Sequence, residues 1–78
     1  MSDTVVHNIK ISYDESDERV RKFVTYLKSA SMKEAMKSYY NQSQASSDKK
    51  ININDEDGNE FTLACNENHI CTLRLRGM

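Results

Sequence analysis

The feature that most constrains this chain is the alternation of apolar and polar side chains toward its C-terminus. Three runs alternate in this way: residues 49–55, 59–65 and 70–76, which read KKININD, NEFTLAC and ICTLRLR. Alternation with a period of two places every second side chain on the same face of a β-strand. The three runs therefore predict three strands, each with one apolar face.

The apolar faces of neighbouring strands also predict how the strands pair. In an antiparallel hairpin, these faces coincide only if the numbers of paired residues have an even sum. Between the first two strands this rule leaves a loop at residues 56–58, with Gly58 at the position that needs a left-handed backbone. Between the last two it centres the turn on Asn68 and places Cys65 opposite Cys71. We therefore predict a three-stranded antiparallel meander.

One further strand is predicted near the N-terminus, where residues 4–13 (TVVHNIKISY) also alternate. Its inward face would carry the odd-numbered residues Val5, His7, Ile9, Ile11 and Tyr13. On such a face we expect His7 to be half-buried and bonded to one neighbour. A catalytic or ligand-binding role for His7 is the alternative.

Two stripes of apolar residues with helical spacing lie between these strands. They consist of Val20, Phe23, Val24 and Leu27, and of Met32, Ala35, Met36 and Tyr39. The five-residue step from Leu27 to Met32 rotates the apolar face by about 140° on an ideal helix. We therefore predict two helices, at about 16–29 and 32–41, with one curved helix as the alternative.

The ends of these helices have candidate caps. Asp14, Ser16 and Asp17 each suit the start of the first helix, where a side-chain oxygen can accept a backbone N–H. Ser31, followed by Glu34 three residues later, has the spacing of a capping box for the second. The role of Asp14, Ser16 and Asp17 as candidate caps explains the acidic cluster at 14–18 better than a metal site does.

The whole chain of 78 residues is predicted to form one small α+β domain, residues 1–78. We expect a two-layer β-α-α-β-β-β fold, with a four-stranded, mainly antiparallel sheet in the order 1-4-3-2. Two helices would cover one face of this sheet. Residues 41–48 lack periodicity and predict a mobile loop, and Lys49 and Lys50 are typical of an edge strand.

The sequence contains few residues suited to catalysis or to cofactors. It has two glycines, neither of them in a phosphate-binding loop, and no Gly-x-Ser-x-Gly motif. Cys65 and Cys71 lack the short spacing of a zinc site, and the two histidines, His7 and His69, do not complete one. We therefore predict no enzymatic activity, no metal and no cofactor.

The N-terminus and the apolar runs bear on location. The start of the chain, MSDTVVHNIK, lacks the apolar stretch of a secretory signal, and no run approaches the roughly 20 residues of a membrane span. We therefore predict a cytoplasmic protein without a membrane partner. In that reducing compartment Cys65 and Cys71 would be two reduced, buried thiols. A disulfide, a redox pair and a metal site are the alternatives.

The outward face of the predicted sheet is the main candidate for binding. The residues proposed for contact with a macromolecule are Lys10, Asn52, Arg74 and Arg76 on this face, and Tyr40 on the second helix. We expect a small, non-catalytic cytosolic module that binds another protein, for example as a regulator or inhibitor of a larger assembly. It would be a monomer or a weak homodimer.

Two other functions remain open. Nucleic-acid binding through the basic outer sheet face is the first alternative, although the face has no aromatic residue on which bases could stack. The formal net charge of −1 offers no bulk attraction to phosphate either. A thiol-based redox or metal protein that uses Cys65 and Cys71 is the second alternative.

Overall fold

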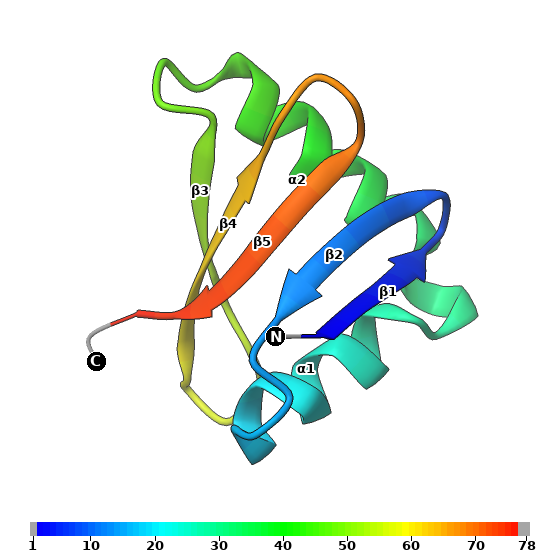
Figure 1. The fold of residues 1–78 in the computed structure, drawn as a ribbon, viewed down its shortest axis with the longest axis vertical. Helices are drawn as coiled ribbons and strands as arrows, with labels where there is room; N and C mark the ends of the chain where they lie inside the picture. Colours follow the sequence, from blue (N-terminus) through cyan, green and yellow to red (C-terminus); the bar gives the residue numbers. More distant parts are fainter. Residues whose placement is uncertain (1, 77–78) are drawn as a thin grey trace.

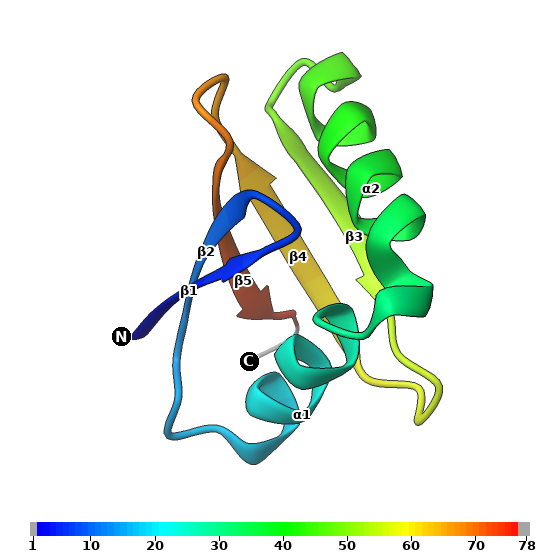
Figure 2. The ribbon, with the colours of Figure 1, turned by 90° about the vertical axis from the view of Figure 1, so that its right-hand side faces the viewer.

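A computed structural model describes residues 2–76 as a five-stranded sheet with helices packed on one face (Figures 1 and 2). Along the chain the elements are β1 (Ser2–Val6), β2 (Ile9–Tyr13), α1 (Glu18–Leu27), the 3-10 turn η1 (Ala30–Met32), α2 (Lys33–Ala45), β3 (Lys50–Asn54), β4 (Glu60–Cys65) and β5 (Ile70–Leu75). The strand order is β1-β2-β5-β4-β3. The predicted α+β class is confirmed. The sheet has five strands and not four: β2, β5, β4 and β3 follow the predicted order 1-4-3-2, and β1 is an additional edge strand.

The C-terminal meander has the predicted register. Leu63 pairs with both Ile51 and Leu73, so one apolar face runs across β3, β4 and β5. Gly58 has a φ of 82°, the left-handed conformation expected of it. The next turn has no glycine, and there His69 takes the left-handed position with a φ of 62°. Periodicity and turn geometry act over short sequence distances, which explains why this part is predictable.

The N-terminal segment is a hairpin, and the prediction of one strand over residues 4–13 is wrong. His7 and Asn8 form a two-residue turn with φ values of 50° and 71°, and Val6 pairs with Ile9 across it. A turn of two residues inverts the parity of the first arm. Val6 is therefore buried at 1% exposure, while Val5 points outward at 65%.

The second arm of this hairpin docks against β5, the central strand of the sheet. β2 lies parallel to β5, with Ile11 opposite Cys71 and Tyr13 opposite Leu73. Since β5 is also parallel to β3, the segment from β2 through α1 and α2 to β3 is a helical crossover between parallel strands, as such strands require. The sheet is therefore mixed. Three of its four strand pairings are antiparallel, as the predicted mainly antiparallel sheet requires, and the pairing of β2 with the last strand is parallel.

The helical segment breaks where the sequence predicts a break. η1 separates α1 from α2, and all four residues of the first apolar stripe are buried on α1. Asp17 caps α1 by accepting a hydrogen bond of 2.9 Å from the backbone N–H of Arg19. Within residues 2–76, the start of α2 has no side-chain cap, so the capping box predicted from Ser31 and Glu34 is wrong.

α2 is longer than predicted, and its buried side is wider than the predicted stripe: Met32 and Met36 are buried as expected, and Ala35 and Tyr39 are partly buried against the core. The helix continues to Ala45, so the first half of the expected loop at 41–48 is helical. Its buried residues are Met36, Tyr40 and Ser43. The Ser43 hydroxyl donates a hydrogen bond of 2.6 Å to the Tyr40 carbonyl, which satisfies this buried polar group within the helix itself.

Cys65 and Cys71 form a disulfide, so the prediction of two reduced thiols is wrong. The predicted register does place them opposite each other, with Cα atoms 4.0 Å apart. Both are buried, at 4% and 0% exposure. The prediction gave too much weight to an inferred reducing compartment, although the strand pairing allowed a bond.

The reversed parity of β1 provides a test of the N-terminal hairpin. Val6→Ala should lower the free energy of unfolding by about 2 kcal/mol, because it removes buried methyl groups from the core. Val5→Ala is the matched control and should change it by less than about 0.5 kcal/mol. Urea denaturation of both variants measures the difference. A larger loss for Val5→Ala would instead support one continuous strand.

The disulfide provides a second test. Reduction should lower the free energy of unfolding by about 2 kcal/mol, because a short closed loop gains conformational freedom in the unfolded chain. Urea denaturation with and without a phosphine reductant measures this loss. A Cys65→Ala plus Cys71→Ala variant is the control and should not respond to the reductant. Rapid alkylation of both cysteines in unreduced, unfolded protein would show that no disulfide is present.

Candidate functional site

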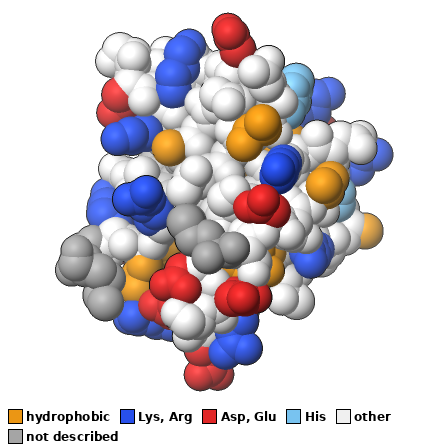
Figure 3. All heavy atoms as spheres, in the orientation of Figure 1, with side chains coloured by type: hydrophobic (Ala, Val, Ile, Leu, Met, Phe, Trp, Pro, Cys, Tyr) orange, Lys and Arg blue, Asp and Glu red, His pale blue; other side chains and the backbone are white. Residues whose placement is uncertain are grey.

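The face of the sheet that the helices do not cover is the main candidate site. We call it the outer face. Strand pairing places fourteen residues on it: Asp3, Val5, Lys10, Ser12, Lys50, Asn52, Asn54, Glu60, Thr62, Ala64, Ile70, Thr72, Arg74 and Arg76. Figure 3 shows this face, with lysine and arginine side chains gathered over the side of the sheet where β3 lies in Figure 1.

A shallow hollow of about 280 Å³ lies within the outer face. We call it the sheet hollow; its lining residues are Lys50, Thr62, Ala64, Thr72 and Arg74. Ala64 stands directly between Lys50 and Thr72 across three strands, and its small side chain leaves the space open. Arg74 stands beside Thr62 in the next row, and Thr62 donates a hydrogen bond of 3.2 Å to Asn52.

Two cations of the outer face are already paired with carboxylates. Lys10 lies 3.5 Å from Asp3, and Arg76 lies 2.9 Å from Glu60. The Ser12 hydroxyl, which donates a bond of 2.6 Å, and then Lys10 hold the pKa of Asp3 below its ordinary value. Asp3 therefore stays charged beside Lys10 at neutral pH.

The two cations of the sheet hollow are not paired. Among residues 2–76, neither Lys50 nor Arg74 makes an ion pair with a carboxylate. Both side chains are exposed, and Thr62 and Thr72 bring two hydroxyl groups between them. Two cations without an ion pair, beside the hydroxyl group of Thr72, make an arrangement that can hold an anionic group.

The structure brings together only part of the predicted contact set. Lys10, Asn52, Arg74 and Arg76 all lie on the outer face, but only Asn52 and Arg74 fall in one row beside the sheet hollow. The predicted contact set did not include Lys50, because its lysine side chain was explained by a position on an edge strand. In the structure Lys50 lines the sheet hollow.

Tyr40 does not lie on the outer face. It is 8% exposed in the helix layer, where its hydroxyl donates a hydrogen bond of 2.9 Å to the Asn66 carbonyl. Its ring stacks on His69 at a centroid distance of 4.4 Å. The buried stripe of α2 includes Tyr40, so the side chain anchors the β4–β5 hairpin and has little surface for a partner.

Exposed apolar side chains occupy the other side of the outer face. Val5 and Ile70 are 65% and 40% exposed and flank Lys10 in one row across β1, β2 and β5. The outer face as defined has no aromatic residue. An extended partner that crosses the strands would therefore meet apolar side chains on one side and the sheet hollow on the other.

The other sites considered for residues 2–76 are a metal site, a reactive thiol and a membrane span. Residues 2–76 contain no group of three or more histidine, cysteine or acidic side chains placed to hold a metal ion. Both cysteines are used in the disulfide. No helix in the described region has the length and apolar character needed to cross a membrane.

Comparison with known proteins provides no relative for this chain. Neither the protein-family models, nor the curated proteins, nor the solved structures include a significant match.

Proposed function

We propose that this chain is a non-catalytic binding module that holds an acidic segment of a partner protein on its outer face. The observation that carries the proposal is the sheet hollow, in which Lys50 and Arg74 have no carboxylate partner in the described chain. Carboxylates are the protein groups that such unpaired cations bind most strongly.

The geometry of the sheet hollow suits a carboxylate. The guanidinium group of Arg74 can donate two parallel hydrogen bonds to one carboxylate, while Lys50 adds a point charge from the opposite side. Thr72 supplies a hydroxyl donor between the two cations, whereas the hydroxyl of Thr62 already donates to Asn52. Asp3 and Glu60 would repel an acidic segment, so they favour a path through the middle of the face.

A protein partner fits the outer face better than a nucleic acid does. The face has four cations, and two of them are paired with Asp3 and Glu60. Nucleic-acid affinity depends on neutralising several phosphates and, for single strands, on stacking bases against aromatic rings. The outer face offers two unpaired cations and no ring, which is enough for one or two carboxylates.

The disulfide bears on the thiol alternative and on location. Cys65 and Cys71 are buried, so an attacking thiolate has little access to either sulfur. A structural role in the hairpin is the simpler explanation. The cytoplasmic location remains a prediction from the sequence, and the disulfide is more typical of an oxidising compartment.

Titration with a short glutamate-rich peptide, followed by backbone amide shifts, tests this function. Shifts should concentrate at Thr62, Ala64 and Thr72. Lys50→Ala plus Arg74→Ala should weaken binding at least about tenfold, since it removes charge-assisted hydrogen bonds. Arg21→Ala plus Lys28→Ala removes the same charge near α1 and should have little effect.

The competing outcomes are distinguishable. If single-stranded RNA or duplex DNA binds more tightly than the peptide at equal ionic strength, and the Lys50 and Arg74 changes abolish it, the outer face is a nucleic-acid site and the proposed partner is wrong. If neither peptide nor nucleic acid shifts the outer face, or if the control variant weakens binding as much, the proposed function fails.

A further inference from the structure

A second hollow, of about 390 Å³, lies where the β1–β2 and β4–β5 turns approach α2. We call it the turn hollow. Its lining residues are His7, Asn8, Ile9, Lys33, Glu34, Lys37, Tyr40, Asn41 and His69. It shares no residue with the sheet hollow and draws on three separate segments of the chain.

Both histidines of the chain line the turn hollow, and both have a left-handed backbone, with φ values of 50° at His7 and 62° at His69. Histidine and asparagine adopt this conformation more readily than most other residues with a side chain.

Contacts on each side hold both imidazole rings in place. His7 Nε2 lies 3.1 Å from the Ser29 carbonyl oxygen. Because a carbonyl only accepts, Nε2 must carry the proton, and Nδ1 is not used in this bond. The His69 ring stacks on Tyr40 with an angle of 10° between the planes. The hydroxyl of Tyr40 is in turn fixed on Asn66, so the hollow has a supported wall.

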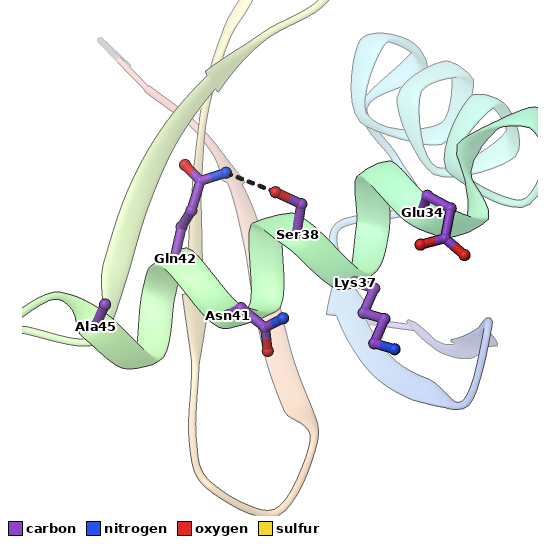
Figure 4. A pocket seen from close by; sticks show the side chains of 6 residues that line it. All are labelled: Glu34, Lys37, Ser38, Asn41, Gln42 and Ala45. Atoms are coloured by element: carbon purple, nitrogen blue, oxygen red, sulfur yellow. Dashed lines mark hydrogen bonds between the residues drawn. The ribbon is translucent and has the colours of Figure 1, made fainter.

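α2 brings charge and amides to the same hollow. Figure 4 draws a different, open hollow along α2, lined by Glu34, Lys37, Ser38, Asn41, Gln42 and Ala45. Glu34, Lys37 and Asn41 also line the turn hollow, and they point from α2 toward the side on which the β1–β2 hairpin lies. Ser38 and Gln42 point the other way and bond to each other at 3.0 Å. Two lysines, Lys33 and Lys37, face the hollow against the single carboxylate of Glu34.

None of the three charged residues of α2 is neutralised by an ion pair within residues 2–76. The turn hollow therefore has an excess of positive charge from Lys33 and Lys37. Asn8 and Asn41 add side-chain amides, which donate as well as accept. The described residues offer no three-ligand set for a metal, so these donors suit an anion.

We propose that the turn hollow binds a small phosphate-bearing molecule. Lys33 and Lys37 supply the charge, and the imidazoles of His7 and His69 donate hydrogen bonds to phosphate oxygens once they are protonated. A tetrahedral oxyanion has several acceptor oxygens, which matches donors that converge from two turns and one helix. The site is separate from the outer face, so it does not depend on the proposed function.

The pH dependence of anion binding tests directly whether the two imidazoles take part. The other charged or titratable groups that line the hollow are Lys33, Glu34, Lys37 and Tyr40, all on α2. Inorganic sulfate is the probe for the pH series, because it stays a dianion throughout, whereas phosphate itself titrates. Affinity for sulfate should rise at least about fivefold from pH 8 to pH 6.

Amide-detected titrations with inorganic phosphate at pH 7 and with sulfate at both pH values test the proposal. Shifts should concentrate at Asn8, Lys37 and His69. His7→Asn and His69→Asn keep a residue that tolerates the left-handed backbone, so each should fold. Together they should remove the pH dependence, whereas Lys33→Ala plus Lys37→Ala should weaken binding about tenfold at both pH values.

Controls separate this site from charge in general and from the outer face. Lys28→Ala, and Lys50→Ala plus Arg74→Ala, should leave sulfate binding unchanged. Melting temperatures of all variants report whether the fold is kept. The proposal is overturned if chloride at equal ionic strength produces the same shifts, if folded histidine variants keep the pH dependence, or if binding is lost with Lys50 and Arg74.

Discussion

The parallel pairing of β2 with β5 is the interaction on which the rest of this structure depends. It joins the N-terminal hairpin to the C-terminal meander, and the backbone N–H of Lys10 donates a bond of 2.9 Å to the His69 carbonyl at one end of the pairing. A two-stranded hairpin is marginal alone, whereas the combined sheet presents one wide apolar face to the helices. Phe23 of α1 stacks on Phe61 at 4.5 Å near the centre of that face.

Both candidate sites follow from this pairing. On the outer face it places Ile70 beside Lys10, so that the apolar and basic parts of the surface become continuous across the strands. At the end of the sheet it brings the β1–β2 turn, with His7, to the same hollow as His69 in the β4–β5 turn. Neither arrangement can be read from short segments of sequence, because the partners are far apart along the chain.

The parts of the fold that could be predicted are those fixed by local rules. Alternation and Gly58 were enough to give the register of β3, β4 and β5, because a shift by one residue would turn an apolar face outward. The N-terminal turn lacks glycine and proline, so residues 4–13 resembled one strand. Val5 and Val6 are both apolar, and either could serve as the inward residue. Only the docking of β2 on β5 decides between them.

The candidate sites were predictable to a smaller extent. The alternation of side chains along the strands placed Lys10, Asn52, Arg74 and Arg76 on the outer face. It could not show that Lys10 would pair with Asp3 and Arg76 with Glu60. Tyr40 was misplaced because the helical phase of α2 depends on tertiary packing. The disulfide was predicted only as an alternative. An inferred reducing compartment was given more weight than the pairing of Cys65 with Cys71, which the sequence predicted.

The most direct test of the account is the direction of the pairing between β2 and β5 in solution, measured by interstrand backbone nuclear Overhauser effects. The account predicts contacts from Ile11 to the region of Cys71 and from Tyr13 to that of Leu73, so that both strands advance together. Contacts between β4 and β5 serve as an internal reference. Contacts that instead run in opposite directions, with Lys10 near Leu73 and Tyr13 near Ile70, would contradict it.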